Sequence, residues 1–154
     1  MKAIPSHARQ NSRALLDHVF QRYCGIELIE QEAGRCRCRL TVTPAVDNLS
    51  QSLHGGVAYA MMDVTSMLAT LPLLAPDEYA VSTNIAVSIL TSMPRNSVAE
   101  FEASVLRAGR TMIFTSCTAF RIGEDKTRTL FATAQISKAR LRKDIRNLGV
   151  GEGS

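Results

Sequence analysis

One long apolar stretch constrains the fold more than any other part of the chain. It covers residues 52–70, SLHGGVAYAMMDVTSMLAT, and Asp63 is the only fully charged side chain between Asp47 and Asp77. By hydropathy the stretch resembles a membrane span, but a lone central Asp costs about 3 kcal/mol in lipid. Pro72 also breaks its end. The sequence therefore predicts a helix buried inside a globular domain.

The runs on both sides of this helix have the pattern of strands. Two short strand-like runs, residues 25–32 and 34–44, precede it around Ala33-Gly34. In the second run, apolar and basic residues alternate, which is typical of a strand with one buried face. Four longer runs follow the helix and are separated by turn residues. They are residues 79–93, 97–109, 110–123 and 128–141.

We expect a single domain over residues 1–154, with its core at about residues 12–139. Residues 11–23 show the apolar spacing of a helix, which Cys24-Gly25 should end. The polar tail, residues 143–154, is expected to fray. The central helix is apolar nearly all round, so a sheet must cover more than one side of it. We therefore expect an α+β fold in which an antiparallel sheet wraps around one long helix, with a second subunit covering the remainder.

Composition excludes several classes of protein. The chain is 45% hydrophobic with a net charge of +4, which indicates a globular protein and no nucleic-acid reader. The N-terminus lacks the apolar core of a signal peptide. The cysteines do not form the paired motifs of a zinc or redox site, so we expect reduced thiols, a cytoplasmic location and no metal. They are Cys24, Cys36, Cys38 and Cys117.

Two features of the central helix suggest chemistry, and each has a structural alternative. Asp63 is either a functional carboxylate or a buried Asp satisfied by the backbone, Thr65 or Ser66. His54-Gly55-Gly56 directly precedes the helix, so its backbone N–H groups lie at the positive end of the helix dipole, where they can hold an oxyanion. The alternative is a glycine-rich turn that allows close packing.

Spacing shows that these two features cannot act together within one chain. Gly55 and Asp63 are eight residues apart, roughly 12 Å along a helix axis. His54 and Asp63, nine apart, fall on opposite faces. If both ends are catalytic, each site must combine two antiparallel helices from a twofold dimer.

The motif N-x5-H-G-G-x6-D, formed by Asn48, His54, Gly55, Gly56 and Asp63, resembles the hotdog-fold acyl-CoA thioesterases of the PaaI-like, phenylacetate-pathway type. The resemblance runs from about residue 12 to 139. It implies the hotdog fold, a homodimer and often a homotetramer built as a dimer of dimers.

The resemblance also implies roles for individual residues. The Gly55 N–H would polarise the thioester carbonyl, and Asp63 from the other subunit would act as nucleophile or general base. Asn48 would position water or the carboxylate, His54 would shape the site, and Ser82 would support the water or substrate. The resemblance implies that five further residues bind the substrate or its coenzyme A arm: Gly56, Arg95, Gly109, Arg110 and Thr111.

The leading hypothesis is therefore an acyl-CoA thioesterase that needs no cofactor, because coenzyme A belongs to the substrate. A non-catalytic acyl-CoA binding or sensing module on the same fold is the alternative, and a dehydratase using His54 is a third. No G-x-S-x-G elbow supports a serine triad. The acyl group cannot be assigned, because side chains such as Met61, Met62, Met67 and Leu68 could line its pocket or form plain core.

Overall fold

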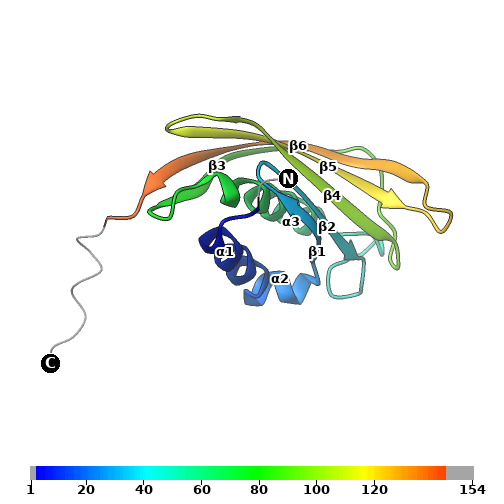
Figure 1. Ribbon diagram of the computed structural model, residues 1–154. Helices are drawn as coiled ribbons and strands as arrows, with labels where there is room; N and C mark the ends of the chain where they lie inside the picture. Colours follow the sequence, from blue (N-terminus) through cyan, green and yellow to red (C-terminus); the bar gives the residue numbers. More distant parts are fainter. Residues whose placement is uncertain (1–2, 145–154) are drawn as a thin grey trace, which may run out of the picture.

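The computed structural model describes residues 3–144 of the 154-residue chain. Figure 1 shows one curved sheet with the longest helix lying against its inner face. The elements in chain order are α1 (Ser6–Leu16), α2 (Val19–Cys24), β1 (Glu27–Glu32), β2 (Arg35–Thr41), α3 (Gly55–Thr70), the 3₁₀ turn η1 (Leu71–Leu73), β3 (Glu78–Ile89), β4 (Val98–Ala108), β5 (Met112–Ile122) and β6 (Arg128–Arg142).

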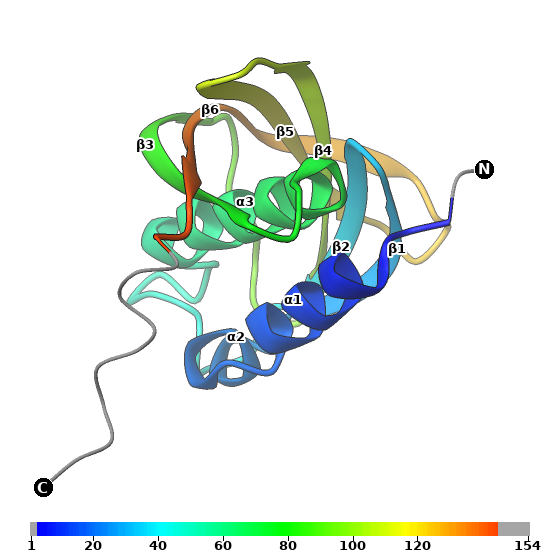
Figure 2. The same ribbon diagram turned by 60° about the vertical axis from the view of Figure 1, so that its left-hand side comes forward.

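The sheet has six strands in the order β1-β2-β4-β5-β6-β3, and each pair is antiparallel. β3 follows α3 in the chain but pairs with β6, so it forms one edge of the sheet. Figure 2 shows α3 running along the inside of the curve, with α1 and α2 to one side of it. This architecture confirms the prediction of one long helix wrapped by an antiparallel sheet.

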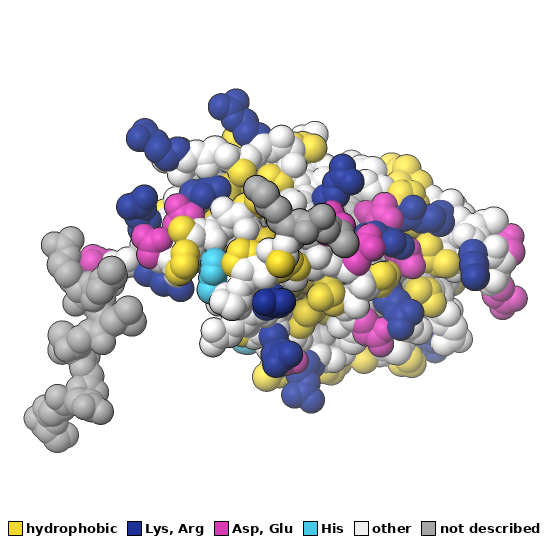
Figure 3. Space-filling model, in the orientation of Figure 1, with side chains coloured by type: hydrophobic (Ala, Val, Ile, Leu, Met, Phe, Trp, Pro, Cys, Tyr) yellow, Lys and Arg dark blue, Asp and Glu magenta, His cyan; other side chains and the backbone are white. Residues whose placement is uncertain are grey.

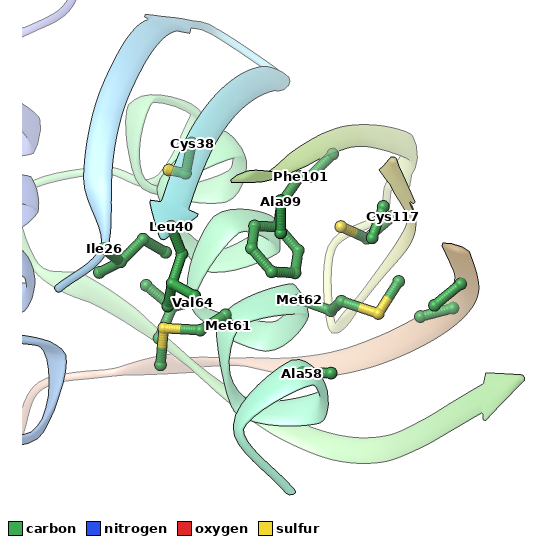
Figure 4. Close-up of a cluster of buried hydrophobic side chains, with 14 of the residues drawn as sticks. Ile26, Cys38, Leu40, Ala58, Met61, Met62, Val64, Ala99, Phe101 and Cys117 are labelled. Carbon is green, nitrogen blue, oxygen red and sulfur yellow. The ribbon is translucent and has the colours of Figure 1, made fainter. Parts of the chain in front are cut away.

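The core lies between α3 and the inner face of the sheet. Met61, Met62 and Leu68 are fully buried there, and Phe101 on β4 packs in the same cluster (Figure 4). Burying each such side chain contributes about 1.5–3 kcal/mol relative to leaving it exposed. The segment Gly55–Leu73 is long and apolar enough to cross a membrane by composition, but 56% of it is buried inside the domain. It is the core helix that the sequence predicts.

The N-terminal region differs from its prediction. Instead of one helix over residues 11–23, the chain forms α1 and α2, because His18 adopts an extended conformation between them. The expected apolar face is therefore split. Leu15 and Leu16 pack against the core, whereas Val19, at 79% exposure, is on the surface. The end at Cys24 is confirmed, since Gly25 adopts a left-handed φ of 75°.

The β1–β2 hairpin confirms the alternation that the sequence shows. Cys36, Cys38 and Leu40 face the core, and the arginines between them face outward. Arg37 pairs there with Glu100 and Glu102 of β4. Basic and acidic side chains are interspersed over the molecular face in Figure 3. All four cysteines are free and buried.

One side of the domain remains open. α3 carries a partly exposed row, Tyr59, Asp63 and Met67, beside the edge strand β3. Ile85 and Ile89 of β3 are each about two-fifths exposed. The helices and strands run from Ser6 at the start of α1 to Arg142 at the end of β6. Most of the tail expected to fray, residues 145–154, lies outside the described residues.

Candidate functional site

The loop before α3 is fixed by hydrogen bonds that place His54 as its N-cap. The His54 backbone N–H donates to Val46 O at 2.9 Å. The His54 imidazole Nδ1 then accepts from the Gly56 N–H at 3.0 Å, which satisfies one of the free donors of the first helical turn. His54 and Gly56 thus hold each other at the start of the helix.

Gly55 is the residue whose N–H is left for a ligand. It is the first helical residue, and no acceptor for its N–H is found between residues 3 and 144. A Cβ built on Gly55 would approach only the Tyr59 ring, at an ordinary contact distance of 3.7 Å. The amide therefore points out of the helix end, where the dipole favours a partial negative charge.

Asn48 presents a donor beside this amide. Its Oδ1 accepts the backbone N–H groups of Ser50 at 2.9 Å and Ser52 at 3.2 Å. Its Nδ2 has no partner in the described part of the chain, so it remains available as a donor. Asn48 and Gly55 line one hollow of about 360 Å³, together with Ile89 of β3. We call Asn48, His54 and Gly55 the loop half-site.

A second group of polar side chains surrounds the carboxylate of the helix. Asp63 Oδ1 accepts from Ser82 Oγ at 2.5 Å and from Lys138 Nζ at 2.8 Å. Lys138 Nζ also donates to Ser82 Oγ at 2.8 Å. Asp63, Ser82 and Lys138 form the carboxylate half-site. The Lys138 ammonium is the counter-charge that the sequence around Asp63 lacks.

Sheet register brings these three side chains together. Ser82 of β3 is paired directly with Lys138 of β6, so both side chains project toward α3. A bulge follows at Thr83 and shifts the register of the two strands. Lys138 is fully buried. Burial lowers the pKa of Lys138, and the charge of Asp63 partly offsets this by favouring the ammonium form.

Sequence reasoning did not identify Lys138, although a signal exists. In the run Ala134-Gln135-Ile136-Ser137-Lys138 the apolar residues occupy every second position. The same alternation puts Lys138 on the buried face with Ala134 and Ile136. A lysine in the apolar row of a strand indicates a buried counter-charge for some carboxylate.

Asp63 keeps one oxygen free. Both side-chain contacts go to Oδ1, whereas Oδ2 has no partner among the described residues, and the side chain is 30% exposed. Thr65 and Ser66, the alternative partners expected for the Asp63 carboxylate, donate to backbone oxygens instead. Thr65 donates to Met61 O, and Ser66 donates to the backbone O of Asp63. The carboxylate is thus held by one oxygen and open at the other, as a nucleophile or general base requires.

The two half-sites remain apart within one chain. Gly55 and Asp63 belong to the continuous helix α3, which separates them by roughly 12 Å along its axis. The hollows beside Asn48 and Gly55 are not lined by Asp63, Ser82 or Lys138. One chain therefore supplies an oxyanion-binding amide and a carboxylate, but not to the same point.

The residues expected at the coenzyme A arm also fall into two places. Arg95 donates to Asp47 at 2.5 Å and lines a hollow of about 810 Å³ with Asn48 and His54. Gly109, Arg110 and Thr111 form the β4–β5 turn, at the other end of the 11-residue strand β4. Such a strand spans roughly 36 Å, so these groups cannot contact one part of a ligand within one chain.

Metal and thiol chemistry find no support in the described residues. No group of three or more His, Cys, Asp or Glu side chains suited to a metal ion occurs among them. Burial raises the pKa of Cys117 and of Cys24, so these two thiols stay protonated and are poor nucleophiles. The hydrogen bond with Cys36 lowers the pKa of Cys38, but Cys38 is fully buried and no substrate can reach its sulfur.

Comparisons with known proteins agree with this geometry. Residues 50–127, half of the chain, match the sequence model of the thioesterase superfamily. A candidate esterase of Caenorhabditis elegans is 33% identical over 89 residues, which are 58% of this chain and 52% of that protein. The chain therefore spans about half the length of this curated relative.

Solved structures share the fold over most of the chain. A thioesterase family protein of Silicibacter pomeroyi has a TM-score of 0.80 at 19% identity, covering 88% of this chain and 98% of its own. The PaaI protein of the Escherichia coli phenylacetic acid degradation operon has a TM-score of 0.78 at 19% identity, covering 92% and 98%. Zebrafish thioesterase superfamily member 2 has 0.73 at 24% identity, covering 84% and 93%. The fold is the hotdog fold, and the chain belongs to the thioesterase superfamily.

Proposed function

We propose that this protein is an acyl-CoA thioesterase that works as a homodimer, with each active site built from the loop half-site of one subunit and the carboxylate half-site of the other. Superfamily membership supports thioester hydrolysis in general. The observation that carries the specific proposal is the state of Asp63: Oδ1 is held by Ser82 and Lys138, while Oδ2 has no partner within residues 3–144 and the side chain is 30% exposed.

The chemistry follows from the two half-sites. The Gly55 N–H would donate to the thioester carbonyl oxygen as it becomes an oxyanion, and Asn48 would hold the attacking water through its free amide donors. Asp63 would either take a proton from that water or attack the carbonyl carbon itself. If Asp63 activates the water, the resulting hydroxide adds to the carbonyl carbon, the C–S bond breaks to give the free acid, and the proton held by Asp63 passes to the departing coenzyme A thiolate. If Asp63 attacks directly, the C–S bond breaks and the acyl group stays on Asp63 as a mixed anhydride. Water then hydrolyses this anhydride, which gives the free acid, restores the carboxylate and supplies the proton for the thiolate.

The open side of the domain supports the dimer. The free edge of β3 offers unpaired backbone groups, and the neighbouring Ile85, Ile89 and Tyr59 are apolar and partly exposed. Pairing two β3 edges about a twofold axis would cover this surface and extend the sheet. The axis would also bring the CoA-arm residues from the two ends of β4 together from different subunits. We also propose that two such dimers assemble into a dimer of dimers. The free thiols suggest a cytoplasmic location.

Thiol release from a panel of acyl- and aryl-CoA esters tests this function. The wild type should hydrolyse at least one class of ester, and Asp63→Asn should lose about 10²–10⁴-fold in kcat, as expected for loss of a general base. Full turnover by a folded, dimeric Asp63→Asn variant would refute the role of Asp63. Binding of acyl-CoA by the wild type without any turnover would instead support the non-catalytic alternative.

A further inference from the structure

A pocket of about 340 Å³ lies between α1, the C-terminal end of α3 and the start of β3. Its apolar walls are Leu15 of α1, Met67 of α3, Leu71 and Leu74 around η1, and Ala80 of β3. We call this space the α1–β3 pocket. Its volume falls within the range of about 300–1,000 Å³ that small-molecule sites occupy.

The α1–β3 pocket lies next to the carboxylate half-site along α3 and β3. Met67 is four residues beyond Asp63, so the two side chains share one face of α3 a single turn apart. Ala80 precedes Ser82 by two residues on β3, so these side chains share one face of the strand. Two walls of the pocket, at Met67 and Ala80, therefore continue the faces of α3 and β3 that carry Asp63 and Ser82.

Contacts outside the pocket hold its far wall in place. His7 of α1 donates through Nε2 to Leu74 O at 2.9 Å. Gln31 of β1 links Ser12 of α1 at 2.8 Å with Leu68 O of α3 at 2.6 Å. These bonds fix α1 against α3 and the η1 segment, so the pocket is formed before any ligand enters.

The charged groups at the mouth of the pocket already have partners. Glu78 Oε2 accepts from Arg140 Nη1 at 2.9 Å and from the Ala75 N–H at 2.9 Å. Lys143 Nζ donates to Pro76 O at 3.2 Å. Asn11 and Tyr79 also line the pocket, and both are uncharged. An occupant would therefore meet mostly apolar walls and no uncommitted charge from Glu78 or Lys143, which suits a hydrocarbon group.

From this continuity, shape and chemistry we infer that the α1–β3 pocket binds the acyl group of the thioester, and that this group is an uncharged apolar chain of medium length. The inference rests on the proposed thioesterase function. Leu71 lies eight residues beyond Asp63, roughly 12 Å along α3, so an acetyl group bonded at the reacting carbonyl would not reach it. Leu15, Met67 and Leu71 are the specificity-determining residues of this site.

Two variants with opposite effects test the inference. The rate constant kcat/KM is measured for saturated acyl-CoA esters of increasing chain length and for phenylacetyl-CoA. Leu15→Phe fills the pocket and should lower kcat/KM for the preferred chain at least tenfold relative to acetyl-CoA. Met67→Ala widens it and should move the preference to longer or bulkier acyl groups. Leu16→Phe, on the neighbouring position of α1 and outside the pocket lining, is the matched control and should leave the profile unchanged.

The outcomes separate this inference from the proposed function. Hydrolysis by the wild type with the same chain-length profile in Leu15→Phe, Met67→Ala and Leu16→Phe would overturn the acyl pocket and leave the thioesterase intact. Absence of all hydrolysis would refute the function, and binding of non-hydrolysable acyl-CoA thioethers then tests the pocket independently. Affinity that rises with chain length, and rises less in Leu15→Phe, supports the pocket; affinity independent of chain length overturns it.

Discussion

Asp63 takes both of its side-chain partners from strands that are distant in the sequence. Ser82 follows it by 19 residues and Lys138 by 75. Lys138 is fully buried, whereas Asp63 is 30% exposed. Solvent can therefore stabilise the carboxylate, but the ammonium depends almost entirely on the carboxylate. The pair explains how an otherwise apolar helix carries a charge at its centre.

The unequal burial of this pair predicts an ordered set of stabilities. Asp63→Asn leaves a buried ammonium without a counter-charge and should lower the free energy of unfolding by about 3 kcal/mol. Lys138→Met should cost less, because the carboxylate it leaves can contact water. The double variant removes both charges and should recover most of the stability but none of the activity. Urea unfolding and thiol release measure these quantities, and a double variant no more stable than Asp63→Asn would contradict the assignment.

Gly55 allows the oxyanion donor to be removed alone. Proline is tolerated at the first helical position, and His54 before it already has the extended conformation, φ −62° and ψ 129°, that a following proline requires. Gly55→Pro should therefore keep α3 folded while lowering kcat by about 10²–10³-fold, through loss of one N–H donor.

Gly55→Ala is the matched control for this change. It keeps the N–H, and its Cβ makes only an ordinary contact with Tyr59. Alanine should retain most of the activity, with helix content by circular dichroism equal in both variants. Equal activity of Gly55→Pro and Gly55→Ala would show that the amide does not take part.

At the scale of elements, β3 links the Asp63 carboxylate to the rest of the fold. Ser82 lies on it, and Glu78 at its start ties the preceding turn to β6 through Ala75 and Arg140. The bond from the Ala75 N–H, followed by the charge of Arg140, lowers the pKa of Glu78 below 4.5. A carboxylate whose folded pKa is lowered stabilises the fold above its unfolded pKa, and this contribution is lost as pH falls through the folded value.

Glu78→Gln should therefore lower the melting temperature at pH 7. The difference from the wild type should shrink as pH falls below the unfolded pKa of the Glu78 carboxyl, and should vanish once pH has also fallen through the lower folded pKa. Thermal unfolding across this pH range measures the effect. Glu124→Gln, at an exposed turn position without an ion pair in the described structure, should show little effect at any pH. A Glu78→Gln difference that is independent of pH would contradict the role of the ion pair.

The elements themselves could be predicted from local pattern, and the exceptions have local causes. Alternation located β2 and the four long strands, and the apolar run located α3. The break between α1 and α2 was not predicted, because the apolar spacing continues through Asp17 and His18 while the backbone turns there. Asp63 and Gly55 could be identified as candidates, but the contact with Lys138 depends on the register of β3 against β6, which no local pattern encodes.

At the scale of the whole molecule, the proposed function divides the active site between the loop half-site of one subunit and the carboxylate half-site of the other. Beside the loop half-site the carboxylate of Asp47 is already paired with Arg95, and Gly55 lies about 12 Å along α3 from the carboxylate half-site. A twofold dimer through β3 would complete two sites at once, so loss of the interface should abolish activity even though every residue remains.

Mixing two inactive variants tests this account most directly. A dimer of one Asp63→Asn subunit and one Gly55→Pro subunit would contain one intact site, because the intact Gly55 of the first subunit meets the intact Asp63 of the second. Random refolding of equal amounts makes half of the dimers mixed, with one of two sites intact, so about one quarter of wild-type activity should return. If the mixture stays as inactive as its components while forming mixed dimers, the site is not shared between subunits.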